Sequence, residues 1–529
     1  MVGHFQVALV RFPEDLYSDP LDVEEEVMLV YFAGAAKARG FNIRVLDFHS
    51  HQEYELPEIM KDAPDLIAVC VRLPGTNMTN SVRQIREFRQ MYSNRAPHIT
   101  LIGHTGTVWK GFTPDSPFDS ILFGEESEFV NLLDVFSKNQ DPSTVTGLAY
   151  KTDKGAIAFN DLPQFGLTVN IDASYHYYLD YLKRNGKRTN FERAAIQTSR
   201  GCYAGCEFCF IQAYKKIMPK LSWRPRPDEE IFNEIEELIT NYGITNFKFF
   251  DMEFVGPGHK GRARAIRLAQ GIIKRGLHIS FLAYIRADHI DEELLLKLKE
   301  AGLTTVFLGV ESFSQNMLKR FNKGVNASTN LQALNLCIKH EIFVHMGLIP
   351  FDSKTVMPEV LENLEMLRDV VSQKPWLFSP TQFIYNPITP IPHTPSTSAS
   401  IQNGVCVLSE SHQGAFADER VSLMANIYSA LAKDASEKQL QVRNYLESRI
   451  ADESGEFDGA QFYSILNWFS GLSIIITNLL YESAQTISKS SNPNEMARRA
   501  IARNHELLTN YDVLAEQILQ GRNNNVHSS

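Results

Sequence analysis

Three cysteines lie within eight residues of one another in the segment TSRGCYAGCEFCF, at Cys202, Cys206 and Cys209. If the 6 cysteines of the chain were placed at random, a C-x3-C-x2-C triplet would occur in roughly one chain in a thousand. Thiolates are ligands for soft metals, so the spacing predicts a zinc site or an iron–sulfur cluster. A structural zinc ion needs four ligands, and the sequence offers no fourth Cys or His nearby. We therefore favour a 4Fe–4S cluster held by three thiolates, which leaves one iron open to bind a substrate or cofactor.

The other cysteines are scattered, which is not the pattern of a disulfide framework. Cys70 and Cys337 lie in apolar segments and are expected to be ordinary core residues. Cys406 lies in a segment whose structure the sequence does not predict. This cysteine usage indicates a reducing, cytoplasmic compartment and one metal site. Zinc, or a loop that holds no metal, is the alternative.

The composition is that of a globular protein with a large core, because 44% of the 529 residues are hydrophobic and 22% are charged. The length predicts about three or four units. A formal net charge of −10 argues against nucleic acid or an anionic membrane as the main partner. The N-terminal residues lack a basic region followed by a long apolar run, so we expect no signal peptide. Residues 466–480 are strongly apolar but too short and too polar to span a bilayer, and we interpret them as a buried helix.

Strand and helix patterns alternate through residues 194–395 and must position the cysteine loop. Apolar runs joined by helical patterns predict a partial (β/α)6 barrel, in which functional residues lie at the carboxyl ends of the strands. The cysteine loop follows the first of these runs. The expected strands are AAIQTS, NFKFFD, HISFLAYI, TTVFLGVE, FVHMGLIP and PTQFIYNPI.

A second α/β unit is expected over residues 1–136, where short apolar runs alternate with helical or polar segments. This pattern predicts a doubly wound, Rossmann-like parallel sheet with helices on both faces. Ligands of such sheets bind outside the carboxyl ends of the strands, here near residues 72–77, 104–107 and 124–127.

The remaining segments are a connector over residues 137–193 that contains a hairpin, a helical domain over residues 396–520 and a disordered tail at residues 521–529. We expect the helical domain to close the barrel and to shape a substrate pocket. Aromatic side chains could line that pocket, although core packing is their more common role. The candidates are Tyr177, Tyr178, Tyr463, Trp468 and Phe469.

The cysteine segment resembles the CxxxCxΦC motif of the radical S-adenosylmethionine (SAM) superfamily, with Phe208 at the aromatic position. The resemblance implies that a 4Fe–4S cluster at the three cysteines cleaves SAM reductively to a 5′-deoxyadenosyl radical. It extends to the strand ends in FFDMEF, LGVES and MGLIP. It places Asp251 and Glu253 at the amino group of SAM, Arg286 at the carboxylate, Glu311 and Ser312 at the ribose, and Gly347, Ile349, Ile384 and Asn386 at the adenine.

Several of these residues have a plainer interpretation. Asp251 and Glu311 could cap the helices that follow their strands. Arg286 could form a surface ion pair, and Gly347 could be a packing glycine.

Residues 5–395 resemble, more specifically, the cobalamin-dependent branch of that superfamily. DSILFGEESEF resembles its GEGE element, and ITPIPHTP resembles its TPxPGT element with His393 in the glycine position. The segment that begins RADHIDEELL resembles the barrel core of the branch. The DxHxxG motif by which other cobalamin proteins ligate cobalt is missing from the sequence, and members of the branch commonly bind cobalamin without it.

The resemblance implies that cobalamin lies at the carboxyl edge of the N-terminal sheet. Arg72 or Leu73 would approach the lower face of cobalt, where an arginine would favour the low-valent metal. Arg72 as a plain charge at a strand end is one alternative, and a flavodoxin-like domain without a cofactor is another. The other residues assigned to the cobalamin site are Thr76, Asn77, His104, Thr105, Gly106, Gly124, Glu125 and Glu126.

The implied function is a cobalamin-dependent radical SAM methyltransferase that methylates a carbon of a small secondary metabolite. An external one-electron reductant of the flavodoxin or ferredoxin type would be its partner, with neither nucleic acid nor a membrane involved. A ring contraction, cyclisation or oxidation without methyl transfer is the alternative reaction. A sensor that keeps the cluster without catalysis is the alternative class.

Overall fold

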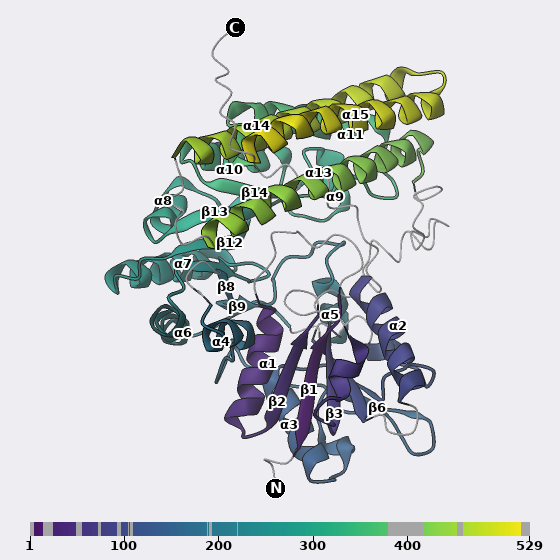
Figure 1. The fold of residues 1–529 in the computed structure, drawn as a ribbon, viewed down its shortest axis with the longest axis vertical. Helices are drawn as coiled ribbons and strands as arrows, with labels where there is room; N and C mark the ends of the chain where they lie inside the picture. Colours follow the sequence, from purple (N-terminus) through teal and green to yellow (C-terminus); the bar gives the residue numbers. More distant parts are fainter. Residues whose placement is uncertain are drawn as a thin grey trace.

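The structure is a computed structural model of the chain (Figure 1). It describes residues 5–13, 25–48, 55–71, 76–92, 97–103, 105, 109–187, 189, 193–218, 221–378, 416–451 and 459–519.

The N-terminal sheet has seven strands in the order β2-β1-β3-β4-β5-β6-β7. The first five pair in parallel, as the alternating apolar runs predict, and the last two form an antiparallel edge. The hairpin of the expected connector therefore belongs to this sheet, which continues past residue 136. The strands are β1 (Gln6–Arg11), β2 (Asn42–Asp47), β3 (Leu66–Val71), β4 (His98–Gly103), β5 (Ser120–Leu122), β6 (Leu148–Lys151) and β7 (Ile157–Phe159).

Helices cover both faces of this sheet, because both faces of its strands are apolar. Helices α1 (Val27–Ala38) and α3 (Glu126–Ser137) pack against each other over one face. Helix α2 (Thr76–Met91) contributes Ile85 and Phe88 to the core on the other face. Short 3-10 helices lie at η2 (Leu56–Met60), η4 (Trp109–Gly111) and η5 (Pro142–Thr144).

A second, five-stranded parallel sheet has the order β14-β13-β12-β11-β8, as expected for consecutive strands of a barrel. A parallel bridge joins Val344 to Phe378, and the expected sixth strand that follows lies outside the described residues. The strands are β8 (Arg193–Ile196), β11 (Asn246–Phe249), β12 (Ser280–Arg286), β13 (Leu303–Glu311) and β14 (Phe343–Leu348).

The outer face of this second sheet packs against helices that connect its strands. An antiparallel ribbon, β9 (Ser199–Arg200) and β10 (Arg224–Pro225), flanks the cysteine loop. The helices are α4 (Tyr177–Arg184), α5 (Ile211–Ile217), α6 (Asp228–Tyr242), α7 (Gly258–Lys274), η6 (Ala287–His289), α8 (Glu292–Glu300), α9 (Gln315–Arg320), α10 (Ala327–Lys339), α11 (Met357–Gln373) and η7 (Pro375–Leu377).

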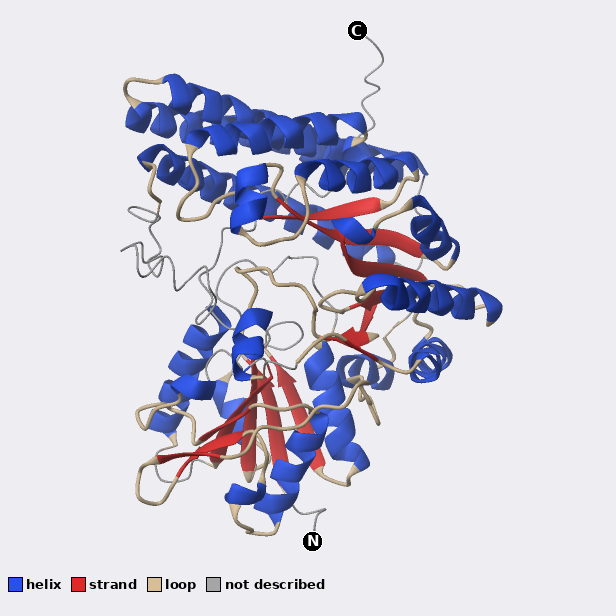
Figure 2. Cartoon of the chain, turned by 180° about the vertical axis from the view of Figure 1, so that it is seen from behind, coloured by secondary structure: helices blue, strands red, loops and turns tan. Residues whose placement is uncertain are grey.

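Three long helices follow the barrel and lie on its side away from the N-terminal sheet (Figure 1, Figure 2). They are α13 (Glu419–Ala451), α14 (Gly459–Lys489) and α15 (Pro493–Leu519). Helix α14 packs against α11 and η7, and Trp468 is buried in the barrel's outer core. Residues 466–480 therefore form part of a helix, as predicted, and Trp468, Leu472, Ile476, Leu479 and Leu480 on it are buried. Tyr177 is also buried, in the N-terminal core, whereas the side chains of Tyr463 and Phe469 lie outside the described residues.

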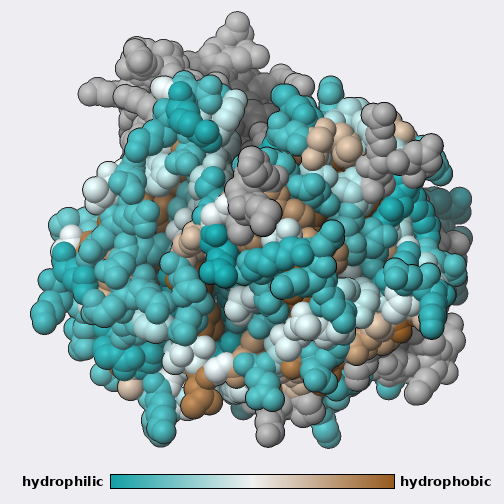
Figure 3. All heavy atoms as spheres, turned by 90° about the horizontal axis from the view of Figure 1, so that it is seen from below, coloured by the Kyte–Doolittle hydropathy of each residue, from teal (hydrophilic) through white to brown (hydrophobic). Residues whose placement is uncertain are grey.

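The described helices include none that is both long and apolar enough to cross a bilayer. Hydrophilic residues predominate on the face shown in Figure 3, where hydrophobic residues form small, separate patches.

Buried charged and polar side chains join the N-terminal unit to the barrel. His176 Nδ1 lies 2.8 Å from Glu25 Oε2, and its Nε2 lies 4.0 Å from Glu234 Oε1 of α6. Tyr31 of α1 donates a hydrogen bond of 3.3 Å to Glu234, which also pairs with Arg226. Interfaces of this polar kind between domains of one chain depend on the charge state of their members.

The stability of this interface should depend on the protonation of His176. Burial alone would lower the pKa of His176, but Glu25 and Glu234 outweigh it and hold the pKa above 6.5. The stabilisation is therefore complete below the unfolded-state pKa and is lost as pH rises through the higher folded-state pKa. We expect the melting temperature to fall more steeply from pH 6 to pH 9 in the native protein than in His176→Gln. The melting temperatures are measured by differential scanning calorimetry. An equal fall of the melting temperature with pH in the native protein and in His176→Gln would contradict this expectation.

Candidate active site

The cysteine loop begins after β9 and is anchored to the far side of the barrel. Cys206 is buried, and Cys202 and Cys209 are half-buried. The backbone N–H of Glu207 donates to the carbonyl of Phe321 at 3.0 Å. The ring of Phe208 meets that of Phe321 edge-to-face at 5.6 Å. The aromatic position of the motif therefore holds the loop against the residues that follow α9.

The three thiols are a donor set that a 4Fe–4S cluster can use. Among the described residues, no three His, Cys, Asp or Glu side chains gather at the spacing of a mononuclear site. A tetrahedral zinc ion would hold its sulfur ligands within about 4 Å of one another, given Zn–S bonds of about 2.3 Å. A 4Fe–4S cluster binds each thiolate through a separate iron. The donor set is all-thiol, as such clusters require.

Asp251 supports the start of the cysteine loop. Its carboxylate accepts hydrogen bonds from the backbone N–H groups of Thr198 (2.8 Å) and Ser199 (2.6 Å) and from the Thr198 hydroxyl (2.6 Å). Burial raises the pKa of Asp251 to about 6, although Arg264 and these bonds act in the opposite direction. The Asp251 carboxylate thus supports the turn before the cysteine loop and does not cap the helix that follows its strand. The predicted contact of Asp251 with the SAM amino group stays a prediction.

Glu253 is likewise occupied by its own turn. It is 1% exposed, and its carboxylate accepts hydrogen bonds from the N–H groups of Val255 (3.1 Å) and Gly256 (2.5 Å). His289 Nδ1 lies 3.2 Å from the same carboxylate. Glu253 thus shapes the loop after β11, and its predicted contact with the SAM amino group stays a prediction.

Arg286 points from the end of β12 into the cysteine loop. It is 7% exposed, so the interpretation as a surface ion pair is wrong. Its Nη1 lies 3.8 Å from Cys206 Sγ, its Nη2 donates to the Lys323 carbonyl at 2.8 Å, and its Nε donates to Asp288 at 2.9 Å. The guanidinium therefore lies where an anionic group bound beside Cys206 would need a cation.

Glu311 and Lys323 form a buried ion pair next to this guanidinium. Lys323 Nζ lies 2.7 Å from Glu311 Oε1, and Lys323 is 5% exposed. Glu311 has a φ of +62°, a conformation that costs a non-glycine residue energy and concentrates at functional sites. The pair places one acceptor and one cation at the end of β13. Lys323 was not predicted, although it lies in the segment RFNKG just after α9.

Ser312 and Gly347 have structural roles. The Ser312 hydroxyl donates to Asn363 Oδ1 at 2.8 Å and accepts from the Ser314 N–H at 3.0 Å, so it orders the turn after β13. Its predicted contact with the ribose stays a prediction. A Cβ on Gly347 would lie 3.0 Å from the Phe307 ring, so the packing interpretation of this glycine holds. The neighbouring Ile349 is buried, and its N–H donates to the Glu311 carbonyl at 2.8 Å.

A layer of rings crosses the barrel interior below these strand ends. Tyr284, Phe307 and His345 are adjacent in the strand register. The rings of Tyr284 and Phe307 stack at 4.8 Å, and Phe250 meets Tyr284 edge-to-face at 5.7 Å. These half-buried rings line the barrel interior between the strand ends and the opposite side of the sheet.

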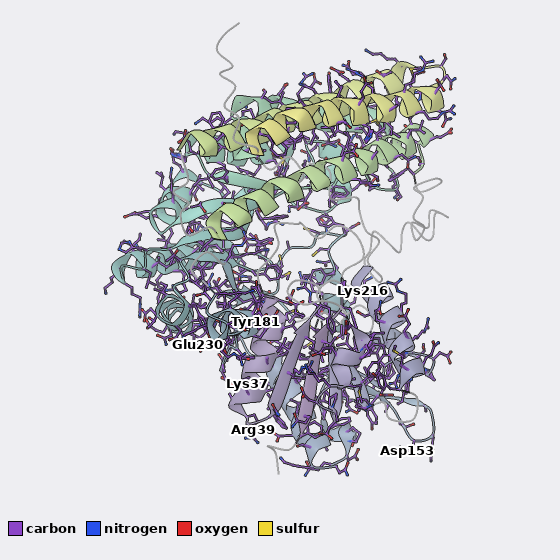
Figure 4. The ribbon with its side chains drawn as sticks, in the orientation of Figure 1. Lys37, Arg39, Asp153, Tyr181, Lys216 and Glu230 are labelled. Atoms are coloured by element: carbon purple, nitrogen blue, oxygen red, sulfur yellow. The ribbon has the colours of Figure 1, made fainter. Side chains whose placement is uncertain are left out.

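The N-terminal sheet faces the cysteine loop with the carboxyl ends of β4 and β5. A cavity of about 110 Å³ lies between them and is lined by residues of both units, including Gly103, Gly124, Arg200 and Ile211. Helix α5, at whose end Lys216 is labelled in Figure 4, contributes Ile211 and Tyr214 to the lining. The carboxyl ends of strands from both sheets thus meet at this cavity.

The predicted cobalamin residues differ in their surroundings. Thr105 is fully buried, and its hydroxyl donates to the Leu122 carbonyl at 2.7 Å, so it braces the sheet. Gly124 lines the cavity, while Glu125 and Glu126 pair with Arg200 and Arg224 of the barrel. Arg72, Leu73, His104, Gly106, Ile384 and Asn386, and the side chains of Thr76 and Asn77, lie outside the described residues.

Comparison with known proteins matches residues 196–369 to the profile of the radical SAM superfamily. The 4′-phospho-dehydrooxetanocin synthase of Priestia megaterium is 26% identical over 352 residues, which cover 61% of this chain and 45% of that protein. The uncharacterized methyltransferase PH0819 of Pyrococcus horikoshii is 29% identical over 253 residues, which cover 46% and 50% of the two chains. The chain therefore spans about half the length of these curated relatives.

The fold is also found in a solved structure. The cobalamin-dependent SAM radical enzyme OxsB, with aqua-cobalamin and SAM bound, matches 98% of this chain and 80% of its own with a TM-score of 0.65 and 16% identity. At this identity the likeness shows that the two proteins share one fold.

Proposed function

We propose, for a chain that carries a radical SAM domain at residues 196–369, that it is a cobalamin-dependent methyltransferase acting on a carbon of a small molecule. The observation that supports the proposal is the cavity where carboxyl ends of both sheets face each other, beside the start of the cysteine loop at Gly201. Arg286 and the Glu311–Lys323 pair lie at the barrel edge. The carboxyl ends of β4 and β5 form the opposing edge.

Different residues of the chain would bind the two cofactors and SAM. Cys202, Cys206 and Cys209 would hold a 4Fe–4S cluster, and the opposing sheet edge would hold cobalamin. When bound, these groups supply the electron that cleaves SAM and the carrier for its methyl group. Arg286 and Lys323 offer cations to the SAM carboxylate, and Glu311 offers an acceptor.

A non-methylating reaction is the second candidate. The relative from Priestia megaterium is named a synthase, not a methyltransferase, so a ring contraction, cyclisation or oxidation on the same site is compatible with the resemblance. Either reaction would use a small substrate and an external one-electron reductant of the flavodoxin or ferredoxin type.

The test needs no knowledge of the substrate. The chain is reconstituted without oxygen with iron, sulfide and hydroxocobalamin, and is then given SAM and titanium(III) citrate. We expect both 5′-deoxyadenosine and S-adenosylhomocysteine, measured by mass spectrometry. 5′-Deoxyadenosine without S-adenosylhomocysteine would favour the non-methylating reaction, and the formation of neither would contradict both.

A further inference from the structure

We propose that Arg200 is a positioning residue that, together with Arg224, clamps the cysteine loop onto Glu125 and Glu126 of the N-terminal unit. This clamp would fix the cysteine loop relative to the carboxyl edge of the N-terminal sheet. The inference rests on the proposed function, because it assigns the clamp the task of aligning the two cofactor sites.

The clamp consists of oppositely charged side chains from the two units. Arg200 donates to both carboxylate oxygens of Glu126 at 2.7 Å, and its Nε donates to Gln197 at 2.8 Å. It also lies 3.4 Å from Glu125 Oε2. Glu125 in turn forms an ion pair with Arg224. The two-pronged contact between Arg200 and Glu126 fixes orientation as well as distance, which a single hydrogen bond would not.

Glu125 and Glu126 compensate the positive charges of the two arginines of the β9–β10 ribbon. Arg200 and Arg224 are direct partners in the antiparallel pair β9–β10, and like charges directly opposite each other are destabilising. Glu125 and Glu126 lie at the N-terminus of α3, where negative charge is favoured. Burial alone would raise the pKa of Glu125, but Arg200 and Arg224 hold it below its ordinary value. The local structure before the cysteine loop is therefore completed by the other unit.

Arg200 is close enough to the cysteines for its position to matter to them. Gly201 follows it with a φ of +78°, and a Cβ there would lie 2.6 Å from the Ser222 carbonyl oxygen. The chain thus makes a tight turn that only glycine fits before it reaches Cys202. Two trans peptide units separate the Arg200 and Cys202 Cα atoms by at most about 7.6 Å. A shift of Arg200 would therefore be passed on to the first thiol.

The clamp also borders the cavity between the two edges. Arg200, Arg224, Glu125 and Glu126 all line it, together with Gly103 at the end of β4. Buried ion pairs add little net stability, because desolvation offsets most of their attraction, whereas removing one partner is costly. We therefore assign the Arg200–Glu126 pair a role in geometry rather than in folding stability.

The experiment compares the native full-length chain with Arg200→Lys, which keeps the charge but loses the fork, and with Glu126→Gln, which keeps the shape but loses the charge. Hydrogen–deuterium exchange is followed by mass spectrometry, as purified and after reconstitution with iron, sulfide and hydroxocobalamin. We expect exchange over residues 199–209 to rise by about tenfold or more in both variants, with α8 unchanged. We also expect the ratio of S-adenosylhomocysteine to 5′-deoxyadenosine to fall by about tenfold.

Two further variants separate positioning from general damage. Arg262→Lys alters a comparable fork, on Asp291 at 2.8 and 3.0 Å, that does not contact the N-terminal unit. It should change neither the exchange over residues 199–209 nor the product ratio. The charge-reversed double variant Arg200→Glu with Glu126→Arg should restore part of the protection that Glu126→Gln loses.

The clamp is overturned if exchange over residues 199–209 stays at the native level in Arg200→Lys and Glu126→Gln, or if both products fall in parallel with a constant ratio. Failure of the proposed function is recognised separately. In that case the native chain itself forms neither product, whereas the exchange of the chain as purified still reports on the clamp.

Discussion

Replacing Cys206 with alanine is expected to lower the rate of SAM cleavage by at least about 1000-fold, equivalent to about 4 kcal/mol at the barrier. Cys206 is the buried member of the three and is the one next to Arg286. Two remaining thiolates cannot hold a cluster that presents a single open iron. The measurement is 5′-deoxyadenosine formed per minute by the anaerobically reconstituted protein, with iron content and the cluster's visible absorption recorded on the same sample.

Cys337→Ala is the matched control. Cys337 is also buried, but it lies in α10 within the outer core of the barrel. Its loss should cost some packing stability and leave iron content and SAM cleavage near native. A Cys206→Ala protein that keeps native iron content and activity would contradict the assignment of the cluster.

Replacing Lys323 with methionine is expected to weaken the binding of SAM by about 100-fold, or about 3 kcal/mol. The variant removes the cation next to the Arg286 guanidinium and leaves Glu311 without its partner at 2.7 Å. Methionine keeps much of the length and volume of the lysine side chain, so the loss reports mainly on charge. Equilibrium dialysis of labelled SAM against the reconstituted protein measures the effect.

Lys374→Met provides the comparison for this variant. Lys374 lies 2.8 Å from Glu341 in a more exposed pair on the far end of α11, and pairs of this kind contribute at most about 1 kcal/mol. The Lys374→Met variant should bind SAM as tightly as the native protein does. Equal SAM affinity in Lys323→Met and Lys374→Met would remove Lys323 from the binding site.

The sheets could be predicted because their signals are local. The run FQVALVRF is almost continuously apolar, as a strand covered by helices on both faces must be, and it forms β1. The run TTVFLGVE forms β13, in which buried and half-buried residues alternate. The boundary at residue 136 was harder to predict, because a hairpin read by itself does not reveal which sheet it joins. Pairing of β5 with β6 decides that, and it is a contact between segments far apart in the sequence.

The site could be predicted in part for the same reason. The spacing of the cysteines and the position of Arg286 at a strand end are visible in the sequence. The partners of Asp251, Ser312 and Thr105 are not, and these partners give each residue a supporting role. Arg200 and Glu126 are 74 residues apart, so only the fold brings them together.

The central claim is that the three cysteines hold a cluster whose open iron binds SAM. Electron–nuclear double resonance on the reduced, reconstituted protein tests it most directly, using SAM labelled with 15N at the methionyl amino group. We expect a 15N coupling to the cluster signal that is lost in Cys206→Ala together with the cluster. A cluster signal that is unchanged by labelled SAM, with no 15N coupling, would contradict the claim.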